Sequence, residues 1–426
     1  MRTVFKNCTL LDGTEGMTVQ KGVDVAVENG KITEIGKVTA KNGDEVIDLT
    51  GKYLMPGLIN LHVHLPAGGR PKNKPLKADQ LAKFALSTAF MRAVALNICH
   101  SYAMQGLMAG VTTVRAVGGL GDIDAKLRDK INSGKLDGPR ILAANYAIGV
   151  PHGHMVGSVA RAANSVDEAV AMVEELASQG VDLIKLMITG GVMDAKVKGE
   201  PGVLMMQPDM IKACCDAAHK HGLKVAAHVQ SPDGVRAAVE NGVDTIEHGS
   251  TLSENEIKVF KDHGAAMICT LSPAMPMARF KRETLGISEA VQYNSNVVYN
   301  NMVSGSKTAL ENGIPVGLGT DTGCPYTTHY NMWRELHYFE RSVGVSPEFA
   351  LYTATLGNAK IAQIDKETGS IEVGKSADML VSNENPFDDF RALSQPYMVV
   401  ARGKVYKNPK IKKYEKCEIE LDKYYD

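Results

Sequence analysis

The sequence predicts an α/β fold: a (β/α)8 TIM barrel of eight parallel strands, with a small β-sandwich domain built from both ends of the chain. Helical patterns alternate with short apolar runs through the middle of the sequence, and this alternation is typical of a parallel sheet. Eight apolar runs occur in this part, which is the number of strands that closes such a barrel. Strand-like segments without helices occupy both ends.

Residues 1–56 and 363–426 are expected to supply the two parts of the small domain. The expected strands cover residues 3–8, 23–28, 31–35, 45–48, 369–373, 377–381 and 398–406. Glu28-Asn29-Gly30-Lys31 has the composition of a type I′ hairpin, and Arg402-Gly403 is expected to form a second turn. Neither part is large enough to bury a good core alone, so we expect the two parts to pair. The basic, tyrosine-rich tail from Lys407 is expected to be a surface appendage.

Residues 57–362 are expected to form the barrel. Its strands are expected at 58–65, 111–117, 140–144, 181–188, 224–228, 244–248, 266–270 and 314–321. The connecting helices are expected at 79–109, 123–133, 166–178, 207–221, 232–241, 254–263 and 288–312. Six of these helices are followed closely by a glycine: Gly110, Gly180, Gly222, Gly242, Gly264 and Gly313. Glycine at this position is how helices commonly end, so these glycines support the assigned boundaries.

Composition excludes several classes of partner. The 47 basic and 48 acidic residues give a net charge of −1, and the absence of a long basic run argues against nucleic acid or an anionic membrane surface. Arg2-Thr3-Val4-Phe5 enters a strand pattern directly, without the apolar region of a signal peptide. The 7 scattered cysteines suit reduced thiols. These features predict a cytoplasmic protein without a nucleic-acid or membrane partner. We also expect a small-molecule partner and a homo-oligomer.

Two histidines interrupt the first barrel strand. His62 and His64 are two residues apart, so in a strand their side chains share one face. They end the strand, before a loop that contains proline and glycine, and this is where a barrel carries its ligands. His-x-His alone fits a metal site and ordinary polar residues at a strand end equally well.

Polar residues also stand in or at the ends of four later strands. Lys185 interrupts the fourth strand, His228 and His248 end the fifth and sixth, and Asp321 ends the eighth. Each alone has an ordinary explanation, such as a helix cap for the aspartate. Together with His62 and His64, they predict a group of metal ligands at one end of the barrel.

This pattern resembles the two-metal form of the amidohydrolase superfamily, in its prolidase-like and imidazolonepropionase-like branch. The segments that carry the resemblance are Thr112-Thr113-Val114-Arg115, His152-Gly153-His154, residues 183–191, Thr245-Ile246-Glu247-His248-Gly249 and residues 369–378. The resemblance implies two divalent ions, one held by His62, His64 and Asp321 and the other by His228 and His248. It further implies that Lys185, carboxylated by CO2, bridges the two ions.

The donor chemistry agrees with these implied roles. A buried lysine shifts its pKa readily, so a neutral amine beside two cations is accessible, and its carbamate is an anionic oxygen ligand. Four imidazoles with two carboxylate-type groups suit Zn²⁺ best, with iron, manganese or cobalt as alternatives. Two such ions share a hydroxide that attacks a carbonyl carbon. Asp321 fits the proton shuttle that passes the hydroxide proton to the leaving nitrogen.

The resemblance implies a metal-dependent hydrolase of a C–N bond, in a dipeptide (Xaa-Pro-like) or an N-acyl amino acid. Cyclic-amide hydrolysis and esterase or lactonase activity are alternatives, because the same hydroxide attacks any polarised carbonyl. A metal-free scaffold is the least favoured alternative, since all six ligands are present.

Substrate contacts are expected from loops that follow the strands. The candidates are His152, His154, Arg115, Gln230 and His329. Three departures from the family pattern bear on the substrate. Ala116 replaces a frequent aspartate, Val150-Pro151 replaces a glycine pair, and Val229-Gln230-Ser231 lacks the tyrosine that often follows the strand-five histidine. This missing tyrosine leaves His152, His154 and Arg115 as candidate partners for a substrate carboxylate.

Overall fold

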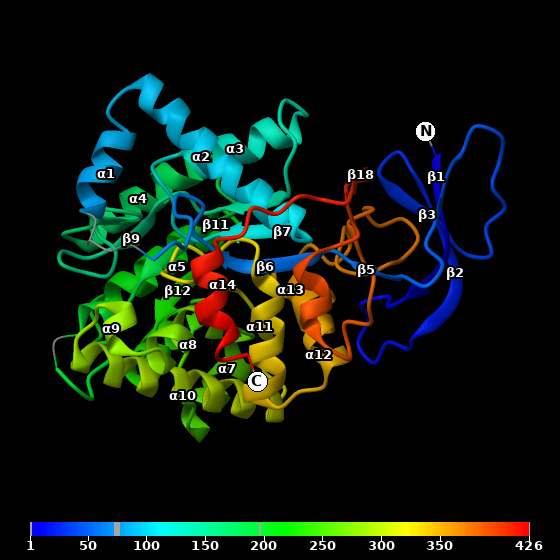
Figure 1. The fold of residues 1–426 in the computed structure, drawn as a ribbon. Helices are drawn as coiled ribbons and strands as arrows, with labels where there is room; N and C mark the ends of the chain where they lie inside the picture. The colour runs from blue at the N-terminus through cyan, green and yellow to red at the C-terminus, as the bar shows by residue number, and fades with distance from the viewer. Residues whose placement is uncertain (1, 72–76, 196, 426) are drawn as a thin grey trace.

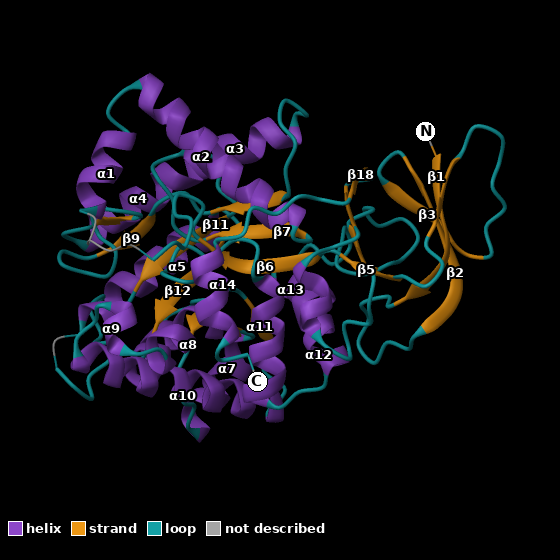
Figure 2. Ribbon diagram, viewed as in Figure 1, coloured by secondary structure: helices purple, strands orange, loops and turns teal. Residues whose placement is uncertain are grey.

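The computed structural model describes residues 2–71, 77–195 and 197–425. The chain forms an α/β body in which helices surround parallel strands, and a β-rich part at one side of this body (Figures 1 and 2). The N-terminus lies in the β-rich part, whereas the last helix packs on the α/β body.

The β-rich part is one eight-stranded sheet that contains strands from both ends of the chain. Its strands are β1 (Arg2–Leu10), β2 (Gln20–Glu28), β3 (Lys31–Gly36), β4 (Glu45–Asp48), β5 (Tyr53–Pro56), β16 (Met379–Ser382), β17 (Met398–Ala401) and β18 (Lys404–Lys407). The two ends of the chain meet where β5 pairs antiparallel with β16. A sandwich of two layers stays a prediction, as do the domain boundaries after residues 56 and 362.

Two short turns shape this sheet as the sequence predicts. Asn29 and Gly30 have φ angles of 51° and 77°, the positive values that a type I′ turn requires at both central positions. Arg402 and Gly403, with φ of 48° and 80°, form the turn between β17 and β18. Residues 369–373, which were expected to form a strand, lie outside the assigned strands.

The α/β body contains two parallel sheets. One has the order β6 (Leu58–Val63), β7 (Val111–Ala116), β8 (Arg140–Ala143). The other has the order β10 (Ala160–Ala162), β9 (Ala147–Gly149), β11 (Leu183–Met187), β12 (Lys224–Val229), β13 (Thr245–His248), β14 (Ala266–Cys269), β15 (Val316–Leu318). Every pair of neighbours is parallel. The structure therefore confirms parallel α/β architecture, but its assigned strands form two sheets and not one closed barrel.

The two sheets are separate because strands at their borders end early. β8 stops before Asn145, which has a φ of 60°, and β15 stops before Gly319 and Asp321, the latter with a φ of 51°. A residue in the left-handed region cannot continue a strand. Backbone hydrogen bonds still cross both borders. The Asp182 nitrogen donates to the Ala143 oxygen at 2.8 Å, and the Asp321 nitrogen donates to the His62 oxygen at 2.8 Å, beside an isolated parallel bridge between Val63 and Thr322.

Most connecting helices lie where the sequence predicts them. They are α3 (Ile123–Asn132), α4 (Val166–Ser178), α5 (Pro208–Lys220), α6 (Pro232–Glu240), α7 (Glu254–His263) and α10 (Glu289–Glu311). The helix expected at 79–109 is instead two helices, α1 (Ala78–Ala85) and α2 (Ala89–Met108), bent by 114°. The break is at Thr88, whose side chain accepts a hydrogen bond from the Met91 nitrogen and so begins a new helix as its N-cap.

Within the described ranges, no single helix is long and apolar enough to cross a membrane; α1 and α2 together pass that test by length and composition only.

Further helices complete the body. They are α8 (Leu271–Arg279), α9 (Arg282–Leu285), α11 (Met332–Tyr338), α12 (Pro347–Tyr352), α13 (Asn358–Ile361) and α14 (Glu415–Asp422), with short 3₁₀ or π turns at Val192–Asp194, Phe339–Val343, Thr353–Gly357 and Phe390–Ser394. The prediction that the C-terminal tail is a surface appendage is wrong. Cys417 and Leu421 of α14 are buried in the main core. Arg334 of α11 binds Glu418 at 2.8 Å and Asp422 at 2.6 Å.

Candidate metal centre

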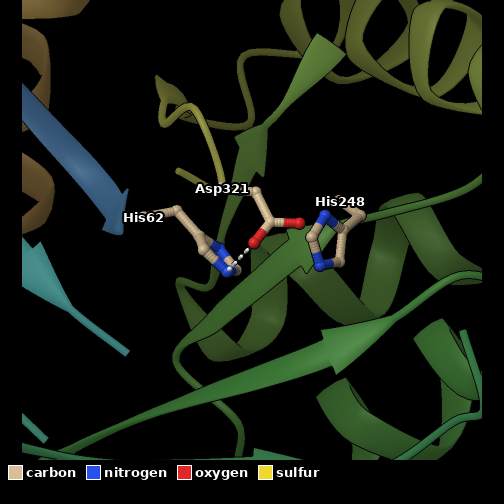
Figure 3. Close-up of side chains that lie close together, drawn as sticks. All are labelled: His62, His248 and Asp321. Atoms are coloured by element: carbon tan, nitrogen blue, oxygen red, sulfur yellow. Dashed lines mark ion pairs between the residues drawn. The ribbon is translucent and has the colours of Figure 1, made fainter. Parts of the chain in front are cut away.

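The polar residues singled out at the strand ends meet in one place. His62, Lys185, His228 and His248 lie in β6, β11, β12 and β13, while His64 and Asp321 follow β6 and β15. The carboxyl ends of parallel strands face the same side of a sheet, which brings these residues together. Figure 3 shows His62, His248 and Asp321 pointing toward one another. One possible ligand atom from each lies within 4.8 Å of the others.

The remaining residues of this group extend the cluster. The Asp321 Oδ1 atom lies 3.4 Å from Nε2 of His62 and 3.2 Å from Nε2 of His64. The ring centroids of His62 and His248 are 4.9 Å apart, and those of His228 and His248 are 4.6 Å apart. Lys185 acts on this cluster, since its charge adds to burial in lowering the pKa of His62, His228 and His248.

Unusual backbone conformations aim two of these side chains. His248 has a φ of 67° and Asp321 a φ of 51°, in the left-handed region that side chains other than glycine rarely adopt. Such strain at a strand end typically belongs to a functional site. Gly319 allows β15 to approach β6 closely, because a Cβ at this position would lie 2.5 Å from the Cβ of His62.

Neighbouring acceptors orient three of the imidazoles. Nδ1 of His62 lies 2.7 Å from Oε2 of Glu247, and Nδ1 of His64 lies 2.8 Å from the Gly118 carbonyl oxygen. Nδ1 of His248 lies 2.7 Å from the Thr270 hydroxyl. A carboxylate or carbonyl partner requires that Nδ1 carries the proton, so the neutral imidazoles of His62 and His64 would keep a free lone pair on Nε2. This arrangement is typical of metal-binding histidines.

The protonation of the cluster also suits a cation. Burial lowers the pKa of His62 and His228 well below the usual value and that of His248 to about 4, so these imidazoles are neutral near pH 7. Burial opposes ionisation of Asp321, but His62 and His64 outweigh it and lower the Asp321 pKa. The cluster therefore presents neutral nitrogen donors beside one carboxylate, which is a donor set for divalent transition metals.

Two buried polar atoms at the centre lack partners. Nζ of Lys185 and Nε2 of His228 have no hydrogen-bond partner in the described part of the chain, and Lys185 is 0% exposed. Burial lowers the Lys185 pKa to about 8. An unsatisfied buried polar group is costly and uncommon in native proteins. The two atoms without partners therefore indicate that a group binds here. The donor residues around them suit a divalent metal ion.

The structure corrects the expectation for Arg115. This residue is 5% exposed and donates to the Leu61 carbonyl at 2.7 Å, to Oγ1 of Thr245 at 3.0 Å and to Oε1 of Glu247 at 2.6 Å. Arg115 thus lies behind His62, where it fixes Glu247, and not against a substrate. Glu247 was not singled out from the sequence, although an acidic residue beside His248 in a short apolar strand is a usable signal.

Replacing Arg115 is expected to affect stability first. Arg115→Met removes three hydrogen bonds and leaves the buried Glu247 carboxylate without its cation. Breaking a buried ion pair typically costs about 3–5 kcal/mol, and we expect a loss of this size in the free energy of unfolding, measured with urea. The exposed Lys258→Met is the control, with an expected change of less than about 0.5 kcal/mol. An Arg115→Met protein as stable as this control would contradict the assignment.

Gln230 and His329 hold loops. Oε1 of Gln230 accepts from the Val192 nitrogen at 3.0 Å. His329 is 4% exposed, its Nε2 lies 2.9 Å from the Ala67 carbonyl oxygen, and its ring stacks on Tyr102 at 5.2 Å. Both side chains therefore fix loops beside the centre, and their contact with a substrate stays a prediction.

His154, by contrast, lies directly at the centre. Its ring stacks on that of His228 at 4.3 Å and 18°. Its Nδ1 lies 2.6 Å from Oδ2 of Asp194, which also accepts from the Gly191 nitrogen. The side chain remains 18% exposed, so part of the ring is open beside the cluster. Asp194 was not singled out from the sequence. His152 is exposed, and its contact with substrate stays a prediction.

The fold and the cluster define an α/β protein with a site suited to a divalent metal. The sequence model of the Amidohydrolase family matches residues 53–406, and the chain belongs to this family.

Similar proteins lie in the prolidase-like branch that the sequence predicts. A candidate prolidase from Bifidobacterium longum has 36% identity and a TM-score of 0.88, over 100% of this chain and 99% of that one. A Xaa-Pro dipeptidase with bound methionine has 28% identity and a TM-score of 0.83, over 96% and 100%. Ochratoxinase from Aspergillus niger is 25% identical, over 90% of this chain and 84% of its own. Family and relatives together identify a hydrolase that acts on amide or peptide bonds.

Proposed function

We propose that the chain is a metal-dependent hydrolase that cleaves the C–N bond of a dipeptide, in particular a Xaa-Pro-like dipeptide, or of an N-acyl amino acid. The observation that carries this proposal is the fully buried Lys185, which lies beside four histidines and Asp321. Its amine has no hydrogen-bond partner in the described structure. The similarity to a Xaa-Pro dipeptidase favours the dipeptide.

Six residues would hold two divalent ions, most suitably Zn²⁺. His62, His64 and Asp321 would bind one ion, and His228 and His248 the other. Lys185, carboxylated by CO2, would supply an oxygen to each. Divalent ions at such a site lower the pKa of a water molecule towards about 7 and polarise a carbonyl oxygen.

The chain's own groups supply proton transfer and orientation. Asp321 is ionised at neutral pH, because its histidine neighbours lower its pKa. In the proposal its carboxylate takes the proton of the attacking water and passes it to the leaving nitrogen. Glu247 and Arg115 keep His62 in one orientation through hydrogen bonds of 2.7 and 2.6 Å.

The strands around the centre are proposed to act as one closed barrel. Support comes from the backbone hydrogen bonds that cross both sheet borders, including that from the His64 nitrogen to the Thr322 oxygen at 2.9 Å. Closure would hold the ligands of β6 at a constant distance from Asp321. The chain is further proposed to act as a homo-oligomer, which light scattering coupled to size exclusion would test.

A substrate screen tests the proposed activity. Zinc-loaded protein would be assayed for amine release from Xaa-Pro dipeptides, other dipeptides and N-acyl amino acids, with cyclic amides, esters and lactones alongside. We expect the highest kcat/KM on a linear dipeptide or N-acyl amino acid. Turnover confined to cyclic amides, esters or lactones would contradict the proposed substrate class and favour the alternative use of the same centre.

His154 is expected to meet a substrate carboxylate. His154→Ala should raise KM about 10–100-fold for substrates with a free carboxylate, the equivalent of a hydrogen bond to a charged group. Matched substrates with an amidated C-terminus should change little, and His263→Ala, at an exposed position on α7, serves as the control. An equal KM change on acid and amide would contradict this role.

A further inference from the structure

A cavity of about 820 Å³ opens at the end of the parallel strands opposite the candidate metal centre. Its wall includes the first residues of several strands, among them Leu183, Lys224, Thr245, Ala266 and Val316. The candidate metal ligands lie at the other, carboxyl ends of the same strands. The cavity is therefore separate from that centre, and its volume lies within the range of about 300–1,000 Å³ for small-molecule sites.

The wall of this cavity is largely apolar. Helices and loops at the amino ends of the strands contribute Leu310, Ile314, Val345, Phe349 and Ile361. Most of its charged groups are already paired. Lys224 binds Asp244 at 2.7 Å, and Asp182 binds Arg128 at 2.7 Å. These pairs leave little net charge for a ligand.

Two residues of opposite charge in the wall differ from these pairs, because neither forms an ion pair with another described residue. Within the described ranges, the Lys360 ammonium has no carboxylate within 4.0 Å, and Glu15 has no cation within that distance. Lys360 donates to the Tyr352 hydroxyl at 3.1 Å. Both residues line the cavity and both are exposed, so their charged groups are open to a ligand in it.

We propose that this cavity binds an apolar α-amino acid. The ligand carboxylate would pair with Lys360, its ammonium with Glu15, and its side chain would lie against the apolar wall. A zwitterion satisfies both free charges at once, whereas a neutral or singly charged ligand leaves at least one of them unpaired. Arg115, which holds Glu247 against His62, also lines this cavity, so the site lies directly behind the metal centre. The inference does not depend on the proposed substrate.

Calorimetric titration of the zinc-loaded protein with L-phenylalanine tests this inference. Phenethylamine and 3-phenylpropanoate serve as probes that lack one charge each. A hydrogen bond to a charged group corresponds to about tenfold or more in affinity, so L-phenylalanine should bind at least about tenfold more tightly than either probe. An absence of L-phenylalanine binding up to its solubility limit would overturn the proposal.

Variants separate this cavity from the catalytic centre, where an amino acid product can also bind. Lys360→Met should weaken one L-phenylalanine binding event about tenfold or more, and Val345→Trp should remove it by filling the cavity. Lys258→Met and Val373→Trp, at exposed positions outside the cavity, are the matched controls. His154→Ala should leave this event intact. Identical binding in all four lysine and valine variants, or loss of all binding in His154→Ala, would overturn the proposal.

A third variant identifies the partner of the ammonium group. Glu15→Gln should abolish the preference for L-phenylalanine over 3-phenylpropanoate while keeping the preference over phenethylamine. Lys360→Met should do the reverse. Circular dichroism and turnover without added amino acid verify that these surface variants fold and remain active. Equal effects of both variants on both probes would contradict the two assigned charge pairs.

Discussion

Lys185→Ala is expected to bind fewer than two divalent ions per chain and to lose most of its activity. The wild-type side chain is fully buried, and its amine has no partner within the described part of the chain. In the proposed centre, its carbamate supplies the negative charge that lets two cations sit close together. Without it, repulsion between the ions favours the loss of one. Loss of an outer partner of a ligand costs about 10–100-fold, and loss of the bridging ligand should exceed this.

Chemical rescue distinguishes this role from a structural one. Acetate or propionate can occupy the space of the missing side chain and supply two oxygens, so millimolar amounts should restore part of both activity and metal content in Lys185→Ala. Lys185→Met fills that space and is the control: it should keep the fold and resist rescue. A structural lysine would instead give lower stability with full metal content. Two ions per chain and unchanged turnover in Lys185→Ala would refute the bridging role.

Asp321→Asn is expected to keep the fold and to lower kcat by about 10²–10⁴, the usual contribution of a general acid–base group. An amide cannot accept the proton that the ionised carboxylate takes. Loss of a charged ligand should add to this effect, so metal content must be measured in the same preparation. Asp262→Asn, at an exposed site, is the control for the chemical change itself. Full kcat in Asp321→Asn with two bound ions would exclude Asp321 as the proton shuttle.

The candidate metal centre was accessible from sequence because its pattern is local. Each candidate ligand lies in or directly after an apolar run, and the order of the runs gives their common end. The structure brings His62, His64, His248 and Asp321 together at this end, with Lys185 and His228 buried beside them. Because the carboxyl ends of parallel strands meet at one face, residues at the ends of successive strands in the sequence lie close together in the fold.

The supporting residues were not accessible in the same way, because their roles depend on distant contacts. Arg115 and Glu247 are 132 residues apart, and His329 and Ala67 are 262 residues apart. The type of residue at each position was compatible with substrate binding, and only the fold shows which hydrogen-bonding groups already hold other parts of the chain. His154 and Asp194, 40 residues apart, form the corresponding pair that remains open at the centre.

Predictions of fold details were wrong where one residue overrides a longer sequence pattern. The apolar stretch over 79–109 suits one helix, but the Thr88 cap begins a second. The tail from Lys407 is polar by composition, yet two buried apolar residues and two carboxylates of α14 attach it to the body. Short irregular segments after β8 and β15 divide the expected barrel into two assigned sheets.

Metal stoichiometry tests the central claim most directly. The protein would be treated with chelator, dialysed, reloaded with Zn²⁺ in the presence of bicarbonate, and analysed by inductively coupled plasma mass spectrometry alongside its turnover of the best substrate. We expect two ions per chain at full activity, loss of activity after chelation, and its return as the second ion binds. Full activity in a metal-free protein, or saturation of activity at one ion per chain, would contradict a two-metal centre.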